Sequence, residues 1–146
     1  MRKNAGGGTE TLERFLDSTL DSVDRAEAVT LQAAEKAGFE EDDLNKIGMA
    51  VREAVVNAVV HGNRYSKHKK VRLSISKAAE RFMVKVSDEG EGFDWNGLPD
   101  PLAQENLLRS SGRGIFLMRA FMDEIEIRKN ADSGTEVTLV KYTSSR

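Results

Sequence analysis

The stretch from Ala50 to Asn63, AVREAVVNAVVHGN, constrains the fold more than any other part of this chain. Read as a helix it is apolar on most sides, so it has to be buried against other elements. Glu53, Asn57 and His61 nevertheless recur every four residues, which puts them on one narrow line of an α-helix. Burying a carboxylate and an amide is costly unless another group hydrogen-bonds or coordinates them. The line therefore marks either a functional site or a solvent edge at Arg52 and Glu53, with Asn57 as a hydrogen-bonded core amide.

Two patterns before this stretch predict a strand and a helix. Short alternation of apolar residues predicts an edge strand over residues 11–17. Helical spacing then predicts a helix over residues 20–37. Ser18 and Thr19 are suitable N-cap residues for this helix, and Gly38 is a suitable end.

The apolar period changes after the central helix. That helix is predicted to begin in an acidic run at residue 40, which suits the helix dipole, and to end at Gly62. Residues 71–75 and 82–86 then alternate between apolar and polar, and residues 77–81 are predicted to form the turn between them. This pattern predicts an antiparallel hairpin with one buried face.

The end of the chain completes a predicted α+β fold. Residues 115–122 are predicted to form a third helix, and residues 124–128 and 135–142 a closing hairpin. Helices and strands together favour a two-layer sandwich, with helices covering one face of a mixed, mostly antiparallel sheet. We expect a flexible glycine-rich lead-in over residues 1–10 and a single domain over residues 11–146.

Composition excludes several classes of protein. With 146 residues and no cysteine, the chain has no disulfide, no zinc–thiolate site and no cysteine nucleophile. A formal net charge of −2 gives no general attraction to nucleic acid or to an anionic membrane. No apolar run is long enough to span a bilayer, and the N-terminus does not resemble a secretory signal, so we expect a cytoplasmic protein. The basic loop over residues 64–70 is either a solvated loop or a contact for phosphate or a partner.

Two glycine motifs stand where elements are predicted to begin or end. Asp88-x-Gly90-x-Gly92 follows a strand, where a carboxylate can accept a hydrogen bond from an exocyclic amine such as that of adenine. The alternative is an aspartate that initiates a turn. Gly112-x-Gly114 precedes the third helix, whose free N–H groups and dipole favour phosphate. Its alternative is an ordinary turn.

The central helix supplies the remaining candidate groups. Asn57 offers a neutral oxygen to Mg²⁺, which prefers oxygen ligands and keeps several waters. Glu53, one turn away, is placed to orient or deprotonate a hydroxyl nucleophile. The sequence contains neither a Walker A loop nor the Gly-x-Gly-x-x-Gly motif of dinucleotide-binding proteins.

The order of these motifs resembles the GHKL (Bergerat-fold) ATPases. It runs Glu53-Ala54-x-x-Asn57-Ala58-x-x-His61-Gly62, then Asp88-x-Gly90-x-Gly92, Gly112-x-Gly114 and Gly134-Thr135. Within that family the chain is most similar to the bacterial anti-sigma factor serine/threonine-protein kinases. The similarity extends from about residue 20 to residue 142.

The resemblance implies a role for each matching position. It implies that Glu53 is the catalytic base and that Asn57 is the Mg²⁺ ligand. It implies that Asp88 reads adenine, with Gly92 beside the base, Gly90 in the same motif and Thr135 assisting through water. A lid over about residues 94–113 would contact the ATP phosphates through Gly112, Gly114 and an arginine. Arg109 and Arg113 both fit that last role.

The resemblance also implies partners and an activity. Such a kinase binds a sigma factor and transfers phosphate from ATP to a serine on a small STAS-type antagonist, often as a homodimer. Neither direct nucleic-acid binding nor a membrane is implied. The alternative function is a non-catalytic ATP-binding module that regulates a partner by sequestration. The ATP-binding half of a sensor histidine kinase is a third possibility, which the lack of an upstream phosphoacceptor helix disfavours.

Overall fold

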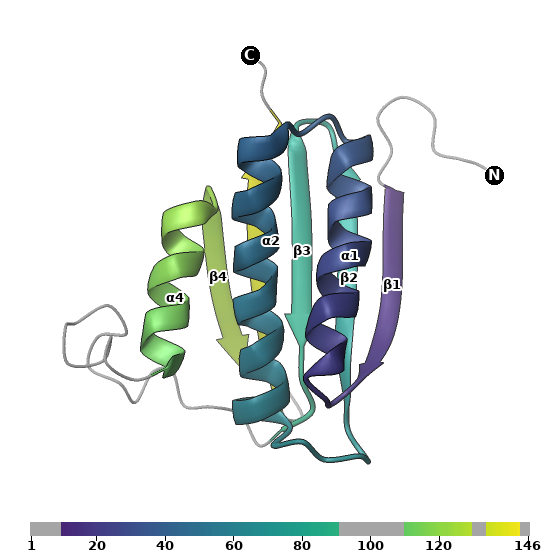
Figure 1. The fold of residues 1–146 in the computed structure, drawn as a ribbon, viewed down its shortest axis with the longest axis vertical. Helices are drawn as coiled ribbons and strands as arrows, with labels where there is room; N and C mark the ends of the chain where they lie inside the picture. Colours follow the sequence, from purple (N-terminus) through teal and green to yellow (C-terminus); the bar gives the residue numbers. More distant parts are fainter. Residues whose placement is uncertain (1–9, 91–109, 130–133, 144–146) are drawn as a thin grey trace.

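A computed structural model describes residues 10–90, 110–129 and 134–143 of the chain (Figure 1). The elements follow one another as β1 (Glu10–Asp17), α1 (Asp21–Lys36), α2 (Glu41–Val56), η1 (Asn57–Gly62), β2 (Lys70–Ala78), β3 (Arg81–Ser87), α4 (Ser110–Phe121), β4 (Glu124–Lys129) and β5 (Thr135–Tyr142). The predicted edge strand, both hairpins and all three helices are therefore present.

The strands form one five-stranded sheet in the order β1-β2-β3-β5-β4. Every pairing between the described strands is antiparallel, so the parallel pair that a mixed sheet requires is not found among them. β3 lies at the centre and pairs Val84 with Ile75 of β2 and with Leu139 of β5. This register keeps the alternating apolar residues of three strands on one face.

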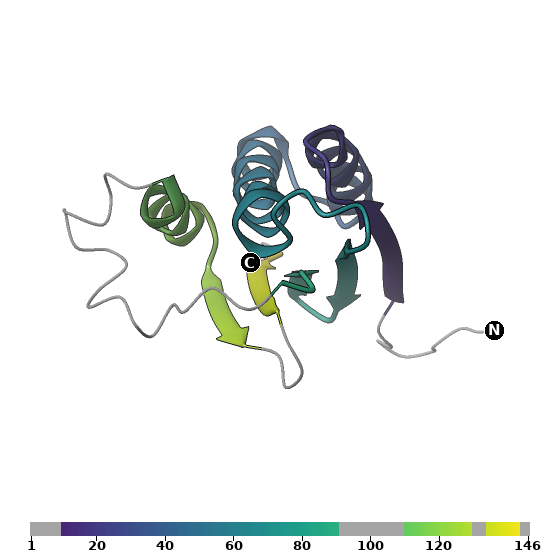
Figure 2. The same ribbon diagram turned by 90° about the horizontal axis from the view of Figure 1, so that it is seen from below.

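The helices α1, α2 and α4 all lie on that face of the sheet (Figure 2). α2 lies between the other two and runs along the middle of the sheet (Figure 1). Its buried residues include Ile47, Val51 and Val55, which join the strand residues in one core. The α+β sandwich with a single helical layer is confirmed, and the apolar character of α2 follows from its central position.

The predicted N-cap of α1 is wrong. The helix begins at Asp21 with Leu20 at the N-cap position, and no side chain caps it. The Ser18 hydroxyl donates instead to the backbone oxygen of Lys69, at 2.6 Å. Ser22 donates to the backbone oxygen of Asp17 at 2.7 Å. The serines therefore fasten the β1–α1 connection to its surroundings and leave the helix end uncapped.

The central helix changes its winding at Asn57. The six residues from Asn57 to Gly62 form the π-helix η1, which ends at Gly62 as predicted. Asn63 N–H accordingly donates to the oxygen of Ala58, five residues back, at 2.7 Å. The step from Glu53 to Asn57 has α-helical spacing, and the next step, from Asn57 to His61, lies within the π-helix. Single π turns inside helices frequently occur at functional sites.

The last helix begins earlier than predicted. α4 starts at Ser110, five residues before the predicted start at Ile115. Gly112 therefore lies in its first turn and Gly114 just after it, and neither precedes the helix. None of the described helices is long and apolar enough to cross a membrane.

Candidate functional site

The Asp88 carboxylate lies at the junction between β3 and β5. Its Oδ1 accepts hydrogen bonds from Gly90 N–H at 3.0 Å and Thr135 N–H at 3.2 Å. The backbone N–H of Asp88 donates in turn to the oxygen of Thr135, at 3.0 Å. Burial raises the pKa of the Asp88 carboxyl, and the two backbone N–H groups partly oppose that rise. The carboxylate is thus buried, and two backbone N–H groups fix its orientation through Oδ1.

Gly62, at the end of η1, lies directly against this carboxylate. A Cβ added at Gly62 would lie within 3.0 Å of all three carboxyl atoms of Asp88. A Cβ on Gly90 would overlap the backbone oxygen of Gly62, and one on Gly134 would overlap the backbone oxygen of Asp88. Three glycines from three segments therefore allow the backbone to close around one acidic side chain.

A second polar pair lies where α4 crosses the central helix. A Cβ added at Gly114 would lie 2.9 Å from Glu53 Oε1 and 3.4 Å from Asn57 Nδ2. Asn57 is buried, and its Nδ2 has no hydrogen-bond partner among the described residues. A buried amide left unpaired costs about 1–3 kcal/mol, so its retention points to a polar ligand.

A small cavity lies between Asn57 and Asp88. Its volume is about 10 Å³, close to that of a single water probe. Its lining comes from η1, the end of α2 and the junction of β3 with β5 and consists of Ala54, Asn57, Ala58, His61, Gly62, Val86, Asp88, Thr135 and Val137. The predicted residues Asn57, Asp88 and Thr135 therefore line one small cavity.

Some predicted residues fall outside the described part of the chain. These are Gly92, Arg109 and the side chain of Arg113, together with most of the predicted lid over residues 94–113. Their predicted roles stay predictions. Sequence reasoning missed Asn63, a buried amide that contacts the segment after Asp88. Its position directly after the helix-ending Gly62 was the only available signal.

Comparison with known proteins identifies the family of the chain. The profile of the histidine kinase-like ATPase domain matches residues 16–141. The chain is 34% identical over 116 residues to the serine-protein kinase RsbW of Staphylococcus epidermidis, covering 73% of this chain and 70% of the relative. It is 31% identical to RsbW of Bacillus subtilis, covering 75% and 71% of the two chains. It is 39% identical to the anti-sigma F factor of Bacillus cytotoxicus, covering 71% and 73%.

A solved structure shows the same fold. It contains the RsbU and RsbW domains of a Mycobacterium tuberculosis protein and superposes with a TM-score of 0.66 at 22% identity. The match covers 94% of this chain and spans about a third (34%) of that solved chain. The family predicted from the motif order is therefore confirmed by both sequence and fold. The chain belongs to the histidine kinase-like ATPase domain family.

Proposed function

We propose that the chain is an anti-sigma factor and an ATP-dependent serine/threonine-protein kinase that phosphorylates a serine on an anti-sigma antagonist. The observation that carries this proposal is the convergence of Glu53, Asn57 and buried Asp88 in a chain similar to RsbW and anti-sigma F factors. An ATP-binding fold alone would support nucleotide binding, and the carboxylate of Glu53 adds a group suited to phosphoryl transfer.

Asp88 is the group that reads adenine in this proposal. Its Oδ1 is already engaged by Gly90 and Thr135, so Oδ2 is the oxygen that accepts the exocyclic amine of the base. Gly62 leaves the space beside Oδ2 that any larger residue would fill. Since the cavity at this point is only about 10 Å³, nucleotide entry requires it to widen.

Asn57 is the residue that would hold Mg²⁺. Among the described residues, no group of three or more acidic or histidine side chains is placed to hold a metal ion, so few protein ligands are available for one. Mg²⁺ fits such a site because it retains waters and takes further oxygens from substrate phosphates. When bound, it would neutralise charge that develops on the phosphates. The Asn57 side chain faces α4 at Gly114, beside the carboxylate of Glu53.

Glu53 acts as the general base. Its carboxylate accepts the proton of the substrate serine hydroxyl while the serine oxygen forms a bond to the γ-phosphorus. The bond between that phosphorus and the β–γ bridging oxygen breaks, and ADP leaves. Glu53 is half-buried beside Gly114, so α4 holds the carboxylate next to the position proposed for the phosphates. Arg109 or Arg113 would contribute positive charge from the lid.

The proposed circuit contains two competing partners. One is a sigma factor and the other a STAS-type antagonist, and the chain would meet both in the cytoplasm, with a homodimer as the proposed assembly. A phosphoserine carries about −1.5 to −2 charges at neutral pH. That charge at the docking surface would release the antagonist and leave the kinase free to hold the sigma factor.

Two substitutions separate this function from a non-catalytic ATP-binding module. Mg·ATP binding is followed by calorimetry and by the fluorescence of Trp95, the only tryptophan. Phosphate transfer to a purified antagonist is followed with labelled ATP. Asn57→Ala is expected to weaken Mg·ATP binding, whereas Glu53→Ala should keep binding and lose transfer. Glu53→Gln, which keeps the shape and removes the base, serves as the matched control.

The two functions predict different results in this experiment. A melting curve gives an independent measure of binding, because ligand at about 100 times its Kd adds about 2.7 kcal/mol of stability. Transfer that survives Glu53→Gln would refute the catalytic role of Glu53. Wild-type binding without transfer would leave the sequestering module, and no binding to the folded wild type would refute both.

A further inference from the structure

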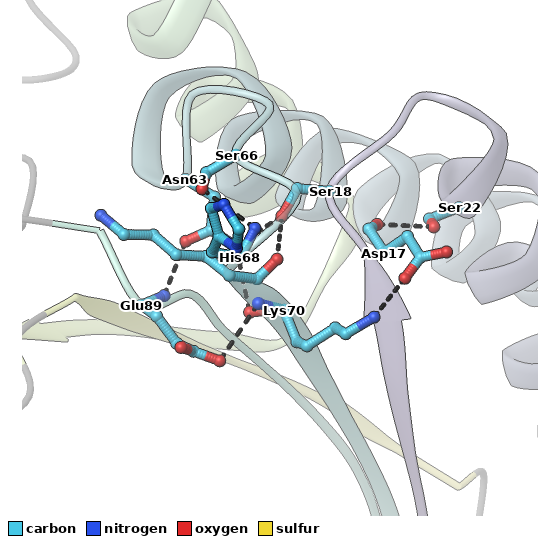
Figure 3. Close-up of polar contacts among 9 residues, drawn as sticks. Asp17, Ser18, Ser22, Asn63, Ser66, His68, Lys70 and Glu89 are labelled. Atoms are coloured by element: carbon cyan, nitrogen blue, oxygen red, sulfur yellow. Dashed lines mark hydrogen bonds and ion pairs between the residues drawn. The ribbon is translucent and has the colours of Figure 1, made fainter.

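The buried side chain of Asn63 connects three segments that are distant in the sequence (Figure 3). Its Nδ2 donates to Ser18 Oγ at 2.9 Å and to the backbone oxygen of Lys70 at 3.0 Å. Its Oδ1 accepts from Glu89 N–H at 2.7 Å. The amide thereby joins the end of η1 to the β1–α1 connection, the start of β2 and the segment after β3.

The contact with Glu89 is reinforced from β2. Lys70 N–H donates to Glu89 Oε2 at 3.1 Å, so Glu89 is held at both its backbone and its side chain. Glu89 is the residue between Asp88 and Gly90, and Gly90 N–H donates to the Asp88 carboxylate. Any movement of the Glu89 peptide therefore moves the N–H group that orients Asp88.

The residue before Asn63 reaches the same carboxylate from the other side. Gly62 packs against the carboxyl atoms of Asp88, and its backbone oxygen lies against Gly90. Two consecutive residues at the end of η1 thus fix the Asp88 carboxylate. Gly62 contacts it directly, and Asn63 acts through its hydrogen bond with the N–H of Glu89, the residue after Asp88. The hydrogen bonds of Asn63 set how far the segment of Glu89 stands from Gly62.

We propose that Asn63 is a positioning residue for base recognition, which holds the segment of residues 88–90 so that the Asp88 carboxylate discriminates adenine from guanine. This inference rests on the proposed function, in which Asp88 accepts the exocyclic amine. Guanine presents a carbonyl oxygen where adenine presents that amine, and an oxygen facing a fixed carboxylate is repelled. A carboxylate free to turn away would lose this selectivity.

The test compares Mg·ATP and Mg·GTP binding by calorimetry in the wild type and in three variants. Asn63→Ala removes the bond to Glu89 and is expected to weaken ATP binding about tenfold while changing GTP binding less. The ratio of the GTP Kd to the ATP Kd should therefore fall. Asn63→Asp keeps an oxygen toward Glu89 N–H and should retain most of the wild-type ratio at a lower melting temperature.

Ser18→Ala is the matched control. It removes one partner of Asn63 and the bond to Lys69, yet Nδ2 keeps the oxygen of Lys70 and Oδ1 keeps Glu89. The melting temperature should fall, and the ratio of the two Kd values should stay at the wild-type value. If Asn63 contributed to stability alone, Asn63→Ala and Ser18→Ala would both lower the melting temperature. The ratio of the GTP Kd to the ATP Kd would then be the same in the two variants.

Three results would overturn the inference. The first is an unchanged ratio in Asn63→Ala, and the second is an equal fall in Asn63→Ala and Ser18→Ala. In both cases the wild type still binds ATP, so the proposed function stands. The third is a folded wild type that binds neither nucleotide, which overturns the proposed function together with the inference. If Asn63→Ala does not fold, Asn63→Ser, whose hydroxyl is too short to reach Glu89, takes its place.

Discussion

Gly62→Ala is a sensitive test of the geometry around Asp88. The added methyl carbon would overlap the carboxyl group of Asp88, against a normal contact of roughly 3.5 Å, so one side must move by about 1 Å. The carboxylate cannot move freely, because Gly90 and Thr135 N–H groups hold its Oδ1 at 3.0 and 3.2 Å. A shift of that size breaks at least one of these two bonds.

The expected loss of stability follows from these contacts. Overpacking of a buried position costs about 1–3 kcal/mol. Losing a hydrogen bond to a charged group adds about 1.5–3 kcal/mol. Alanine has less conformational freedom than glycine in the unfolded chain, and this effect stabilises the folded variant by about 0.4–1 kcal/mol. Gly62→Ala should therefore lower the free energy of unfolding by about 2–5 kcal/mol, or the melting temperature by about 6–15 °C for a chain of this size.

Gly48→Ala in α2 is the control for this substitution. A Cβ on Gly48 would meet Glu27 Oε2 at 3.0 Å, and that atom is the end of a flexible side chain that can move aside. Alanine is also favoured over glycine in a helix by up to about 1 kcal/mol, so Gly48→Ala should be neutral or stabilising. Urea unfolding of both variants measures the difference. If Gly62→Ala unfolds within about 0.5 kcal/mol of the wild type and binds ATP equally well, the close packing of η1 against Asp88 is refuted.

Two further substitutions test charges in the fold. Because burial raises the pKa of the Asp88 carboxyl above its ordinary value of 3.8, the stability it contributes in acid is lost as the pH rises through its folded-state pKa. Asp88→Asn should therefore unfold at a higher urea concentration than the wild type at neutral pH, and this difference should disappear toward pH 3. The variant should also bind ATP more weakly. A difference in stability that stays constant with pH would contradict this reasoning. Lys141, nearly buried, donates to the oxygen of Phe121 at 3.2 Å and lies 3.8 and 3.7 Å from carboxylate oxygens of Asp43 and Asp123. Lys141→Met should destabilise the chain by about 1–2 kcal/mol in urea unfolding, less at high salt, since both aspartates are partly exposed; equal stability at low salt would rule out this ion pairing.

The regular elements were predictable because their patterns are local. Alternation in β2 and β3 follows directly from burial of one sheet face, and the register pairs Val84 with Ile75 as that burial requires. The apolar character of α2 likewise indicated its central place in the helical layer. The antiparallel arrangement of all five strands was less accessible, since strand order depends on packing between distant segments.

The exceptions arise where a tertiary contact outweighs a local preference. Serine is a favoured N-cap residue, but the Ser18 hydroxyl donates to the backbone oxygen of Lys69 and accepts from Asn63 Nδ2. Ser18 therefore holds the β1–α1 connection against the segments before β2 and does not cap α1. The π-helix at Asn57 has no sequence signature in the alanine–valine run. The helix of α4 extends through Gly112 despite the low helix propensity of glycine, where Gly114 packs against Glu53.

The candidate site shows why motif order was informative before any contact was known. Asn57 leaves a buried amide unpaired, and Asp88 keeps a carboxylate where burial disfavours its charge. Asn57 and Asp88 both reduce the stability of the folded chain, because apolar side chains at these two buried positions would avoid the cost of burying polar groups. Selection for folding alone does not produce them together at one small cavity. A polar ligand that pairs with both groups accounts for their retention, and nucleotide binding should therefore stabilise the wild type more than it stabilises Asp88→Asn.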